Sequence, residues 1–354
     1  MGGGLMQLVA YGAQDIYLTG NPQITFFKVV YRRHTNFSME CIEQTLNGSV
    51  SAGSRVTATI SRNGDLISSS FVELTSANVQ TDVANFGAAA FDNIELEIGG
   101  QRIDKHHSDW LEAWAELTQP NPSCTVGTGG DADGTLFQNM SGMGGVAADG
   151  NSAAVVKRVP LQFWFNRNPG LALPLIALQY HEVKIIMNFS SVAGTGANFA
   201  AKLWVDYIYL DTDERRRFAQ QSHEYLIEQV QRQTLTSSAI SHDLNFNHPV
   251  KELVWTGVVT NGATFAALNS VNYTLKLNGH DRFAAQDVRY FSEMQVYQHH
   301  TGQSLLQSAG TGGKFGGARI AVYSFALKPE EHQPSGTCNF SRIDNAQLTT
   351  SADP

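Results

Sequence analysis

The chain has 354 residues, of which 24 are Lys or Arg and 32 are Asp or Glu, so its formal net charge at pH 7 is −8. This acidic balance excludes a basic tail and a strong electrostatic footprint for nucleic acid, while the 42% hydrophobic share is enough to bury a sizeable core in about two domains. Charged residues make up only 16% of the chain, below the roughly 25% typical of globular proteins, which indicates a surface that is neutral, rich in loops or covered, as large subunit contacts would cover it.

The sequence contains no apolar run of about 18 residues, so a membrane-spanning helix is excluded. The opening residues, MGGGLMQLVAYG, lack the basic and apolar regions of a secretory signal. Cys41, Cys124 and Cys338 are widely spaced and form no paired framework, which favours buried thiols in a reducing compartment. We therefore expect the chain to stay in the cytosol.

Short apolar or alternating segments recur along the whole chain between Gly, Asn, Asp and Pro residues. Period-2 alternation with this punctuation is typical of β-strands, and many short strands favour sandwiches or barrels. The predicted strands cover residues 55–60, 70–74, 94–98, 161–165, 183–189, 203–210, 225–230, 253–259, 273–277 and 320–327. The chain is therefore predicted to be mostly β.

Two segments show helical patterns. Residues 108–118 place Trp110 and Leu117 on one apolar face, which predicts a short helix that decorates the fold. Residues 211–221, DTDERRRFAQQ, have acids in the first turn and arginines after them, as a helix dipole favours. This charge run separates two strand-rich halves and is the expected domain boundary; a phosphate contact by residues 215–217 is the alternative.

The two halves contain a weak internal repeat. Residues 94–103 read IELEIGGQRI and residues 273–283 read YTLKLNGHDRF, each an alternating strand followed by a Gly-Gly or Asn-Gly turn. Gly100 and Gly279 are 179 residues apart, about half the chain. This spacing predicts two copies of one β-domain.

Two tracts rich in Gly, Ser or Asp interrupt the strands, at residues 120–154 and 303–318. A structureless loop of this length is uncommon inside a compact domain unless it has a role at the surface. We expect exposed loops at the ends of the sandwiches; a flexible linker is the alternative.

Patterns that would indicate catalysis or metal binding are incomplete. Adjacent residues of a strand point to opposite faces, so neighbouring histidines on a strand cannot bind one ion, and the two His-Glu pairs lack the second His of HExxH. Residues 312–315, GGKF, carry Phe where a phosphate loop needs Ser or Thr. The pairs concerned are His106-His107, His299-His300, His181-Glu182 and His223-Glu224. We predict no catalytic residue, no metal ligand and no cofactor, and thus no enzyme.

Six Asn-x-Ser/Thr sequences occur, and most lie on predicted strands. They begin at Asn36, Asn47, Asn139, Asn188, Asn272 and Asn339. Only Asn139, in the long first loop, is expected to be an exposed glycan acceptor. Coincidence in a chain rich in Asn and Ser is the alternative for all six.

Residues 8–40, LVAYGAQDIYLTGNPQITFFKVVYRRHTNFSME, closely resemble the N-terminus of the major capsid proteins of large icosahedral double-stranded DNA viruses, particularly those of algae. Further matching blocks extend to the end of the chain. They include ELEIGGQRIDKH (95–106), NPGLALPLIALQYHEVKI (168–185), WVDYIYLDTDERRRFAQ (204–220) and YSFALKPEEHQPSGTCNFSRIDNAQL (323–348).

The resemblance implies an all-β fold of two consecutive eight-stranded antiparallel jelly rolls, with a few short helices in loops. It implies homotrimers of pseudo-hexagonal outline, which agrees with the repeat because three copies of two similar domains give six corners. The expected parts are an N-terminal arm (1–24), a first jelly roll (25–212), a linker (213–223) and a second jelly roll (224–354).

The resemblance also implies partners and a location. The chain is expected to contact its own copies, neighbouring capsomers, and minor capsid and penton proteins, and to contact the inner membrane only indirectly. No sequence-specific contact with nucleic acid is expected. The arm, residues 1–22, would face the interior of the virion and the long loops would face outward, with glycans on them. Assembly would take place in the host cytoplasm.

One departure from the family concerns the C-terminus. Family members usually continue past the block at residues 341–348 through another strand, whereas this chain stops at Pro354. We expect a fragment whose second jelly roll lacks its last strand; completion of that barrel by other means is the alternative. Residues 141–145, SGMGG, look like the family's usual terminal motif placed in a loop. The alternative functions are a glycan-binding jelly-roll module, a minor capsid paralogue and a cupin-like metalloenzyme.

Overall fold

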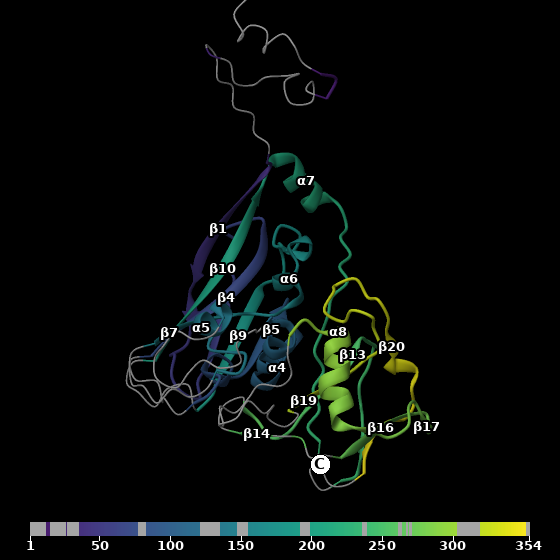
Figure 1. Ribbon diagram of the computed structural model, residues 1–354. Helices are drawn as coiled ribbons and strands as arrows, with labels where there is room; N and C mark the ends of the chain where they lie inside the picture. Colours follow the sequence, from purple (N-terminus) through teal and green to yellow (C-terminus); the bar gives the residue numbers. More distant parts are fainter. Residues whose placement is uncertain are drawn as a thin grey trace, which may run out of the picture.

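The computed structural model describes residues 12–14, 26, 35–76, 83–120, 135–146, 155–191, 199–235, 239–260, 264–266, 268, 271–302 and 319–351. Figure 1 shows two β-rich halves side by side, with helix α7 (Thr212–Gln220) between them along the chain. Among these described residues, no helix is long and apolar enough to cross a membrane.

The first half is a sandwich of two antiparallel sheets. One has the order β1 (Phe37–Gln44), β10 (Ala200–Leu210), β4 (Leu66–Ser76) and β7 (Val155–Pro160), with β8 (Leu173–Pro174) also paired to β4. The other has the order β2 (Leu46–Asn47), β3 (Arg55–Thr59), β9 (Val183–Phe189), β5 (Phe91–Ile98) and β6 (Gln101–His107). Alternate residues such as Val72, Leu96 and Leu203 face inward and are completely buried, so the core lies between the sheets.

The second half repeats much of this order. Its larger sheet is β11 (Ser241–Asp243), β21 (Ala346–Thr350), β16 (Asn272–Leu277) and β17 (His280–Asp281), with β18 (Gln286–Asp287) on β16. β13 (Glu252–Thr256) pairs with β19 (Ile320–Ser324). The smaller pairs are β12 (Pro249–Val250) with β20 (Cys338–Asn339), and β14 (Val259–Thr260) with β15 (Thr264–Phe265). The expected absence of a last strand from the second jelly roll stays a prediction.

The predicted repeat corresponds to two equivalent hairpins. β5 and β6 are joined by Gly99 and Gly100, and β16 and β17 by Asn278 and Gly279. All four connecting residues have positive φ, between 52° and 82°. Two-residue hairpin turns of type I′ need this geometry, which explains Gly-Gly and Asn-Gly at these positions.

The longer helices agree with the predictions, but one has a different role. α4 (Ser108–Thr118) and α7 are both present, and Asp211 caps α7 by accepting the N–H of Thr212. The expectation that residues 108–118 merely decorate the fold is wrong, because α4 is buried from Leu111 to Leu117. The remaining short helices are α3 (Phe86–Ala89), α5 (Leu136–Ser141), α6 (Trp164–Arg167), α8 (Gln295–His299), η1 (Pro169–Leu171), η2 (Tyr290–Met294) and η3 (Phe340–Arg342).

Several predicted strand boundaries are wrong. Residues 161–165 enter α6 instead of a strand, because a short run of buried apolar residues has no period that separates strand from helix. Residues 225–230 belong to an extended segment, residues 222–235, that joins no sheet. We call residues 222–235 the strap. Cys41 was expected to be buried but is exposed on the edge strand β1, and Cys124 lies outside the described residues.

Candidate functional site: the junction of the two sandwiches and the exposed faces

The two neighbouring-histidine pairs lie in different surroundings in the structure. His106 is buried, with its ring 2.9 Å from Asp104 and stacked on Phe163. His299 lies in α8 and His300 directly follows it, so the argument from strand geometry does not apply to this pair. The part of the chain that the structure describes contains no group of three residues suited to hold a metal ion. Residues 312–315 lie outside that part.

His300, directly after α8, forms an ion-pair cluster in the second jelly roll. Its side chain is fully buried, with Nε2 3.0 Å from Glu252 Oε2 and Nδ1 3.0 Å from Glu330 Oε1. Burial alone would lower the pKa of this imidazole, but the two carboxylates raise it to about 9. His300 is therefore a charged structural residue at neutral pH.

Asn139, the predicted glycan acceptor, lies in α5 and not in an irregular loop. It is half-buried, and its side-chain amide donates to the carbonyl of Thr135 at 3.2 Å. The hydroxyl residue of its sequon, Ser141, is completely buried and donates to the Phe137 carbonyl. Glycosylation at Asn139 stays a prediction.

The two sandwiches meet through helix α4. Its residues Ala113 and Leu117 pack against the outer face of the β13–β19 pair, where Ile320 and Val322 are fully buried. Val296 of α8 joins the same apolar cluster, and Figure 1 shows α4 and α8 at this junction. Burial of a Leu side chain contributes about 1.5–3 kcal/mol, so the cluster fixes one sandwich on the other.

Hydrogen bonds from the second sandwich close the end of α4. The carbonyls of Leu117 and Thr118 have no partner within the helix, and they accept from Gly302 N at 2.7 Å and Thr301 Oγ1 at 2.8 Å. A Cβ atom on Gly302 would lie 2.2 Å from the Glu116 carbonyl oxygen, so only glycine permits this approach. The second sandwich thus supplies the C-terminal cap of a helix of the first.

A pair of buried acids lies on α4 beside the junction. Glu112 is fully buried and Glu116 is 5% exposed, and the two carboxyl groups share a hydrogen bond. Burial raises the pKa of Glu112 to about 7, and burial together with the charge of Glu112 raises the pKa of Glu116 well above its usual value. Arg319, next to β19, partly opposes the rise at Glu116. At neutral pH a protonated Glu116 therefore donates to Glu112.

The glycine-rich turn at residues 141–145 holds this pair. Glu112 accepts from Gly144 N at 2.9 Å and from Gly145 N at 2.7 Å. Both glycines have positive φ, 84° and 81°, so successive N–H groups converge on the carboxylate. The SGMGG turn, which resembles a terminal motif of the family, thus has a local physical role. Its backbone N–H groups bind the carboxylate of a helix side chain, and we call this arrangement the cradle.

The strap runs between the sandwiches. It binds the neighbouring backbone through glutamine side-chain amides instead of the backbone hydrogen bonds of paired strands. Gln231 donates to the Asn247 carbonyl and accepts the Asn247 N–H, at 3.1 and 2.9 Å. Gln233 does the same with the Asp243 carbonyl and the Asn245 N–H, at 2.6 and 3.0 Å. Each amide supplies one donor and one acceptor, as a backbone neighbour would. The other side of the strap contacts the first sandwich, where Gln229 donates to the Ile103 carbonyl.

Ion pairs connect the strap to both halves and α7 to the first half. Glu228 binds Arg167 of the first sandwich at 2.9 Å and also contacts Lys251 of the second. Arg215 binds the buried Asp65 through two nitrogens, at 2.9 and 2.7 Å. Arg216 and Arg217 each pair with an acid of α7 itself. The arginine run is therefore neutralised within the chain, and the phosphate interpretation finds no support.

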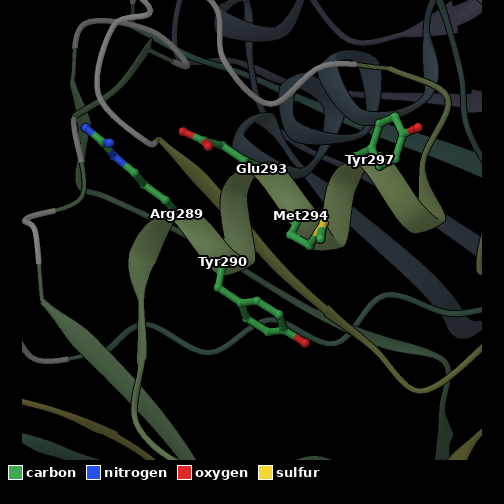
Figure 2. A pocket seen from close by; sticks show the side chains of 5 residues that line it. All are labelled: Arg289, Tyr290, Glu293, Met294 and Tyr297. Atoms are coloured by element: carbon green, nitrogen blue, oxygen red, sulfur yellow. The ribbon is translucent and has the colours of Figure 1, made fainter.

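The described residues leave two faces with large apolar side chains uncovered. The first is a groove of about 420 Å³ along η2 and α8, and Figure 2 shows its lining side chains. Tyr297 is 84% exposed there and Met294 is 49% exposed. The second is the outer face of β4, β7 and β10, where Phe71 and Trp204 stack with their ring centroids 6.3 Å apart and Val156 is 46% exposed. Exposed apolar patches of this kind mark interaction surfaces.

Sequence reasoning missed the buried acid pair and the strap. Glu112 and Glu116 resemble the solvent-exposed face of an amphipathic helix, although Ala, Leu or Trp occupies six of the other nine positions of α4. The strap carried a usable signal, because Gln229, Gln231 and Gln233 alternate with the period of an extended chain.

Comparisons with known proteins agree with this architecture. The family model "Major capsid protein N-terminus" matches residues 25–211, and "Large eukaryotic DNA virus major capsid protein" matches residues 214–354. The major capsid protein of Pyramimonas orientalis virus is 52% identical, over 98% of this chain and 91% of the relative. That of Paramecium bursaria Chlorella virus 1 is 44% identical, over 99% of this chain and 87% of the relative.

Solved structures give the same result for the fold. The quasi-atomic model of the PBCV-1 virus capsid matches with a TM-score of 0.71 and 38% identity, over 92% of this chain and 86% of that one. The Faustovirus major capsid protein, at 13% identity, has a TM-score of 0.61 over 97% of this chain and 91% of its own, which concerns the fold alone.

The prediction of two consecutive jelly rolls is confirmed. The relatives are structural proteins and not enzymes. The chain belongs to the family of major capsid proteins of large eukaryotic DNA viruses, and its place is the capsid of the virion.

Proposed function

We propose that this chain forms homotrimeric capsomers of pseudo-hexagonal outline, which tile the icosahedral shell of a large double-stranded DNA virus. The observation that carries the proposal is the fixed junction between two similar jelly rolls, made by Ala113 and Leu117 against β19 and by the cap on α4. Because the two jelly rolls are held as one body, three copies give six comparable corners, and such tiles cover a flat facet.

Finer features of the proposal concern the partners. Capsomers would contact neighbouring capsomers, minor capsid proteins and penton proteins, and assembly would take place in the host cytoplasm. Residues 1–24 would form an inner arm, residues 213–223 a linker, and the long loops an outer surface that carries glycans. The low share of charged residues, 16%, and the net charge of −8 support protein contacts more than contacts with nucleic acid.

Native mass spectrometry of the purified chain tests the oligomeric state. We expect a species of three times 38.6 kDa. A monomer that persists at high concentration would contradict the proposal. In purified virions, the chain should dominate the stained gel; a minor band would instead indicate a minor capsid paralogue.

A further inference from the structure

The bonds that close the end of α4 depend on a buried histidine of the second jelly roll. The His300 side chain lies between Glu252 of β13 and Glu330 of the turn at residues 329–330. Each ring nitrogen is 3.0 Å from one of these carboxylates. A neutral imidazole has one donor and one acceptor, so both carboxylates are satisfied only when both nitrogens carry a proton.

Glu330 connects this histidine to the cap of α4. Its Oε1 atom, which faces His300, also accepts the N–H of Thr301 at 2.9 Å. The Thr301 hydroxyl donates to Glu330 Oε2 at 2.9 Å and to the Thr118 carbonyl of α4 at 2.8 Å. The next N–H, that of Gly302, donates to the Leu117 carbonyl at 2.7 Å. A continuous series of contacts therefore runs from the imidazole of one jelly roll to a helix of the other.

The junction can open without either core opening. The first jelly roll has its own apolar core between its two sheets, and the second has a core around Tyr273, Phe291 and Leu348. The contact between the two is the smaller cluster around Leu117, together with the cap. Parts of a protein with few buried contacts open at a lower free energy than its cores.

The other charged groups near the junction form a separate set. Glu112 and Glu116 of α4 act on each other, and Arg319 acts on Glu116. His299, which precedes His300, contacts the Leu327 carbonyl at 3.0 Å. Among the described residues, the charges that act on His300 are those of the two carboxylates beside it. The protonation of this imidazole is therefore decided inside the second jelly roll.

We propose that the proton on His300 is a latch between the two jelly rolls. With the proton in place, the imidazolium holds Glu330, and Glu330 positions residues 301–302 against the last turn of α4. Without it, the imidazole can donate to only one of its two carboxylates, and Glu330 loses its fixed position. The end of α4 then separates from residues 301–302, while each jelly roll keeps its own core. This inference goes beyond the proposed capsomer, because it concerns a change within one chain.

Hydrogen–deuterium exchange at residues 301–302 tests the latch, because the Gly302 N–H binds the other jelly roll and the Thr301 N–H binds Glu330. Burial lowers the pKa of His300, but the two carboxylates raise it from 6.5 to about 9. Protection of these two amides should therefore fall by up to about 40-fold between pH 7 and pH 9, after correction for exchange of an unfolded chain. Protection of β9 and β16, in the two cores, should change by less than about threefold.

Three variants identify the group responsible. His300→Gln should expose the amides of residues 301–302 to exchange already at pH 7 and remove the dependence on pH. His299→Gln is the matched control, because His299 is exposed and lies outside the carboxylate pair, and it should keep the wild-type fall. Thr301→Val removes the hydroxyl and keeps the shape of the side chain. It should lower the protection of Gly302 while the NMR signal of His300 still titrates near pH 9, which would show that the proton acts through Thr301.

Two results would overturn the latch in the wild type and its variant. One is equal protection of Gly302 at pH 7 and pH 9, and the other is a wild-type fall that persists in His300→Gln. A parallel loss of protection in β9 and β16 would also overturn it, since the chain would then unfold as a whole. Native mass spectrometry at pH 7 tests the homotrimer separately, so failure of one proposal can be told from failure of the other.

Discussion

The buried acid pair on α4 predicts that the folded chain loses stability as the pH rises. The pKa of Glu112 is raised from 4.5 to about 7 by burial, so the folded chain holds a proton that the unfolded chain releases. Its contribution is fully present below pH 4.5 and is lost as the pH rises through about 7. One pKa unit corresponds to about 1.4 kcal/mol, so the loss from this group amounts to about 3 kcal/mol. The raised pKa of Glu116 extends the loss to higher pH.

Glu112→Gln should remove most of this dependence. The amide oxygen still accepts from Gly144 and Gly145, and the amide nitrogen can donate to Glu116, so the contacts are kept while the titration is not. Urea unfolding at pH 5 and pH 7.5 should show a fall in the unfolding free energy that is about 2.5 kcal/mol smaller in the variant than in the wild type, because part of the loss has already occurred at pH 5. Glu182→Gln, at an exposed carboxylate, is the control and should keep the wild-type slope. Equal slopes in Glu112→Gln and the wild type would refute the assignment.

Leu117→Ala should lower the unfolding free energy by about 2–5 kcal/mol because it opens a cavity in the junction. The control Leu327→Ala, at a residue 74% exposed, should change it by less than about 0.5 kcal/mol. Urea titration of both variants measures the difference. Arg215→Met leaves the buried Asp65 carboxylate without its cation and should cost about 2 kcal/mol, while Arg217→Met, whose partner Glu214 is on the same exposed helix, should be nearly neutral in the same assay. His300→Gln should abolish a loss of stability that the wild type shows as the pH rises from 6.5 through about 9, since the raised pKa means that the imidazolium stabilises the fold below that range; thermal unfolding across this range checks it.

Local patterns predicted the elements whose conformation is decided within a few residues. The strands at residues 183–189 and 273–277 show clear alternation or apolar runs between turn residues, and the Gly-Gly and Asn-Gly pairs dictate hairpin turns through their positive φ. The acids and arginines of residues 211–221 likewise favour a helix on their own. Element type followed from sequence where no distant contact competes with it.

The junction could not be predicted because its causes are distant in sequence. Burial of Glu112 depends on a turn more than 30 residues away, and burial of Leu117 depends on β19, about 200 residues away. The strap is extended, as the strand pattern at residues 225–230 indicates, but it joins no sheet because glutamine side chains occupy the place of a neighbouring strand. Alternation indicates an extended chain and does not identify what the chain pairs with.

The cradle at Gly144 and Gly145 also affects how the long insertion between α4 and β7 can change. By fastening residues 135–146 to the helix, it anchors the insertion at a point between its two ends. The entropy of closing a loop grows only slowly with its length, so residues can be added on either side of this anchor at small cost. Sequence can thus diversify on both sides of the cradle while the helix that joins the two jelly rolls keeps its position.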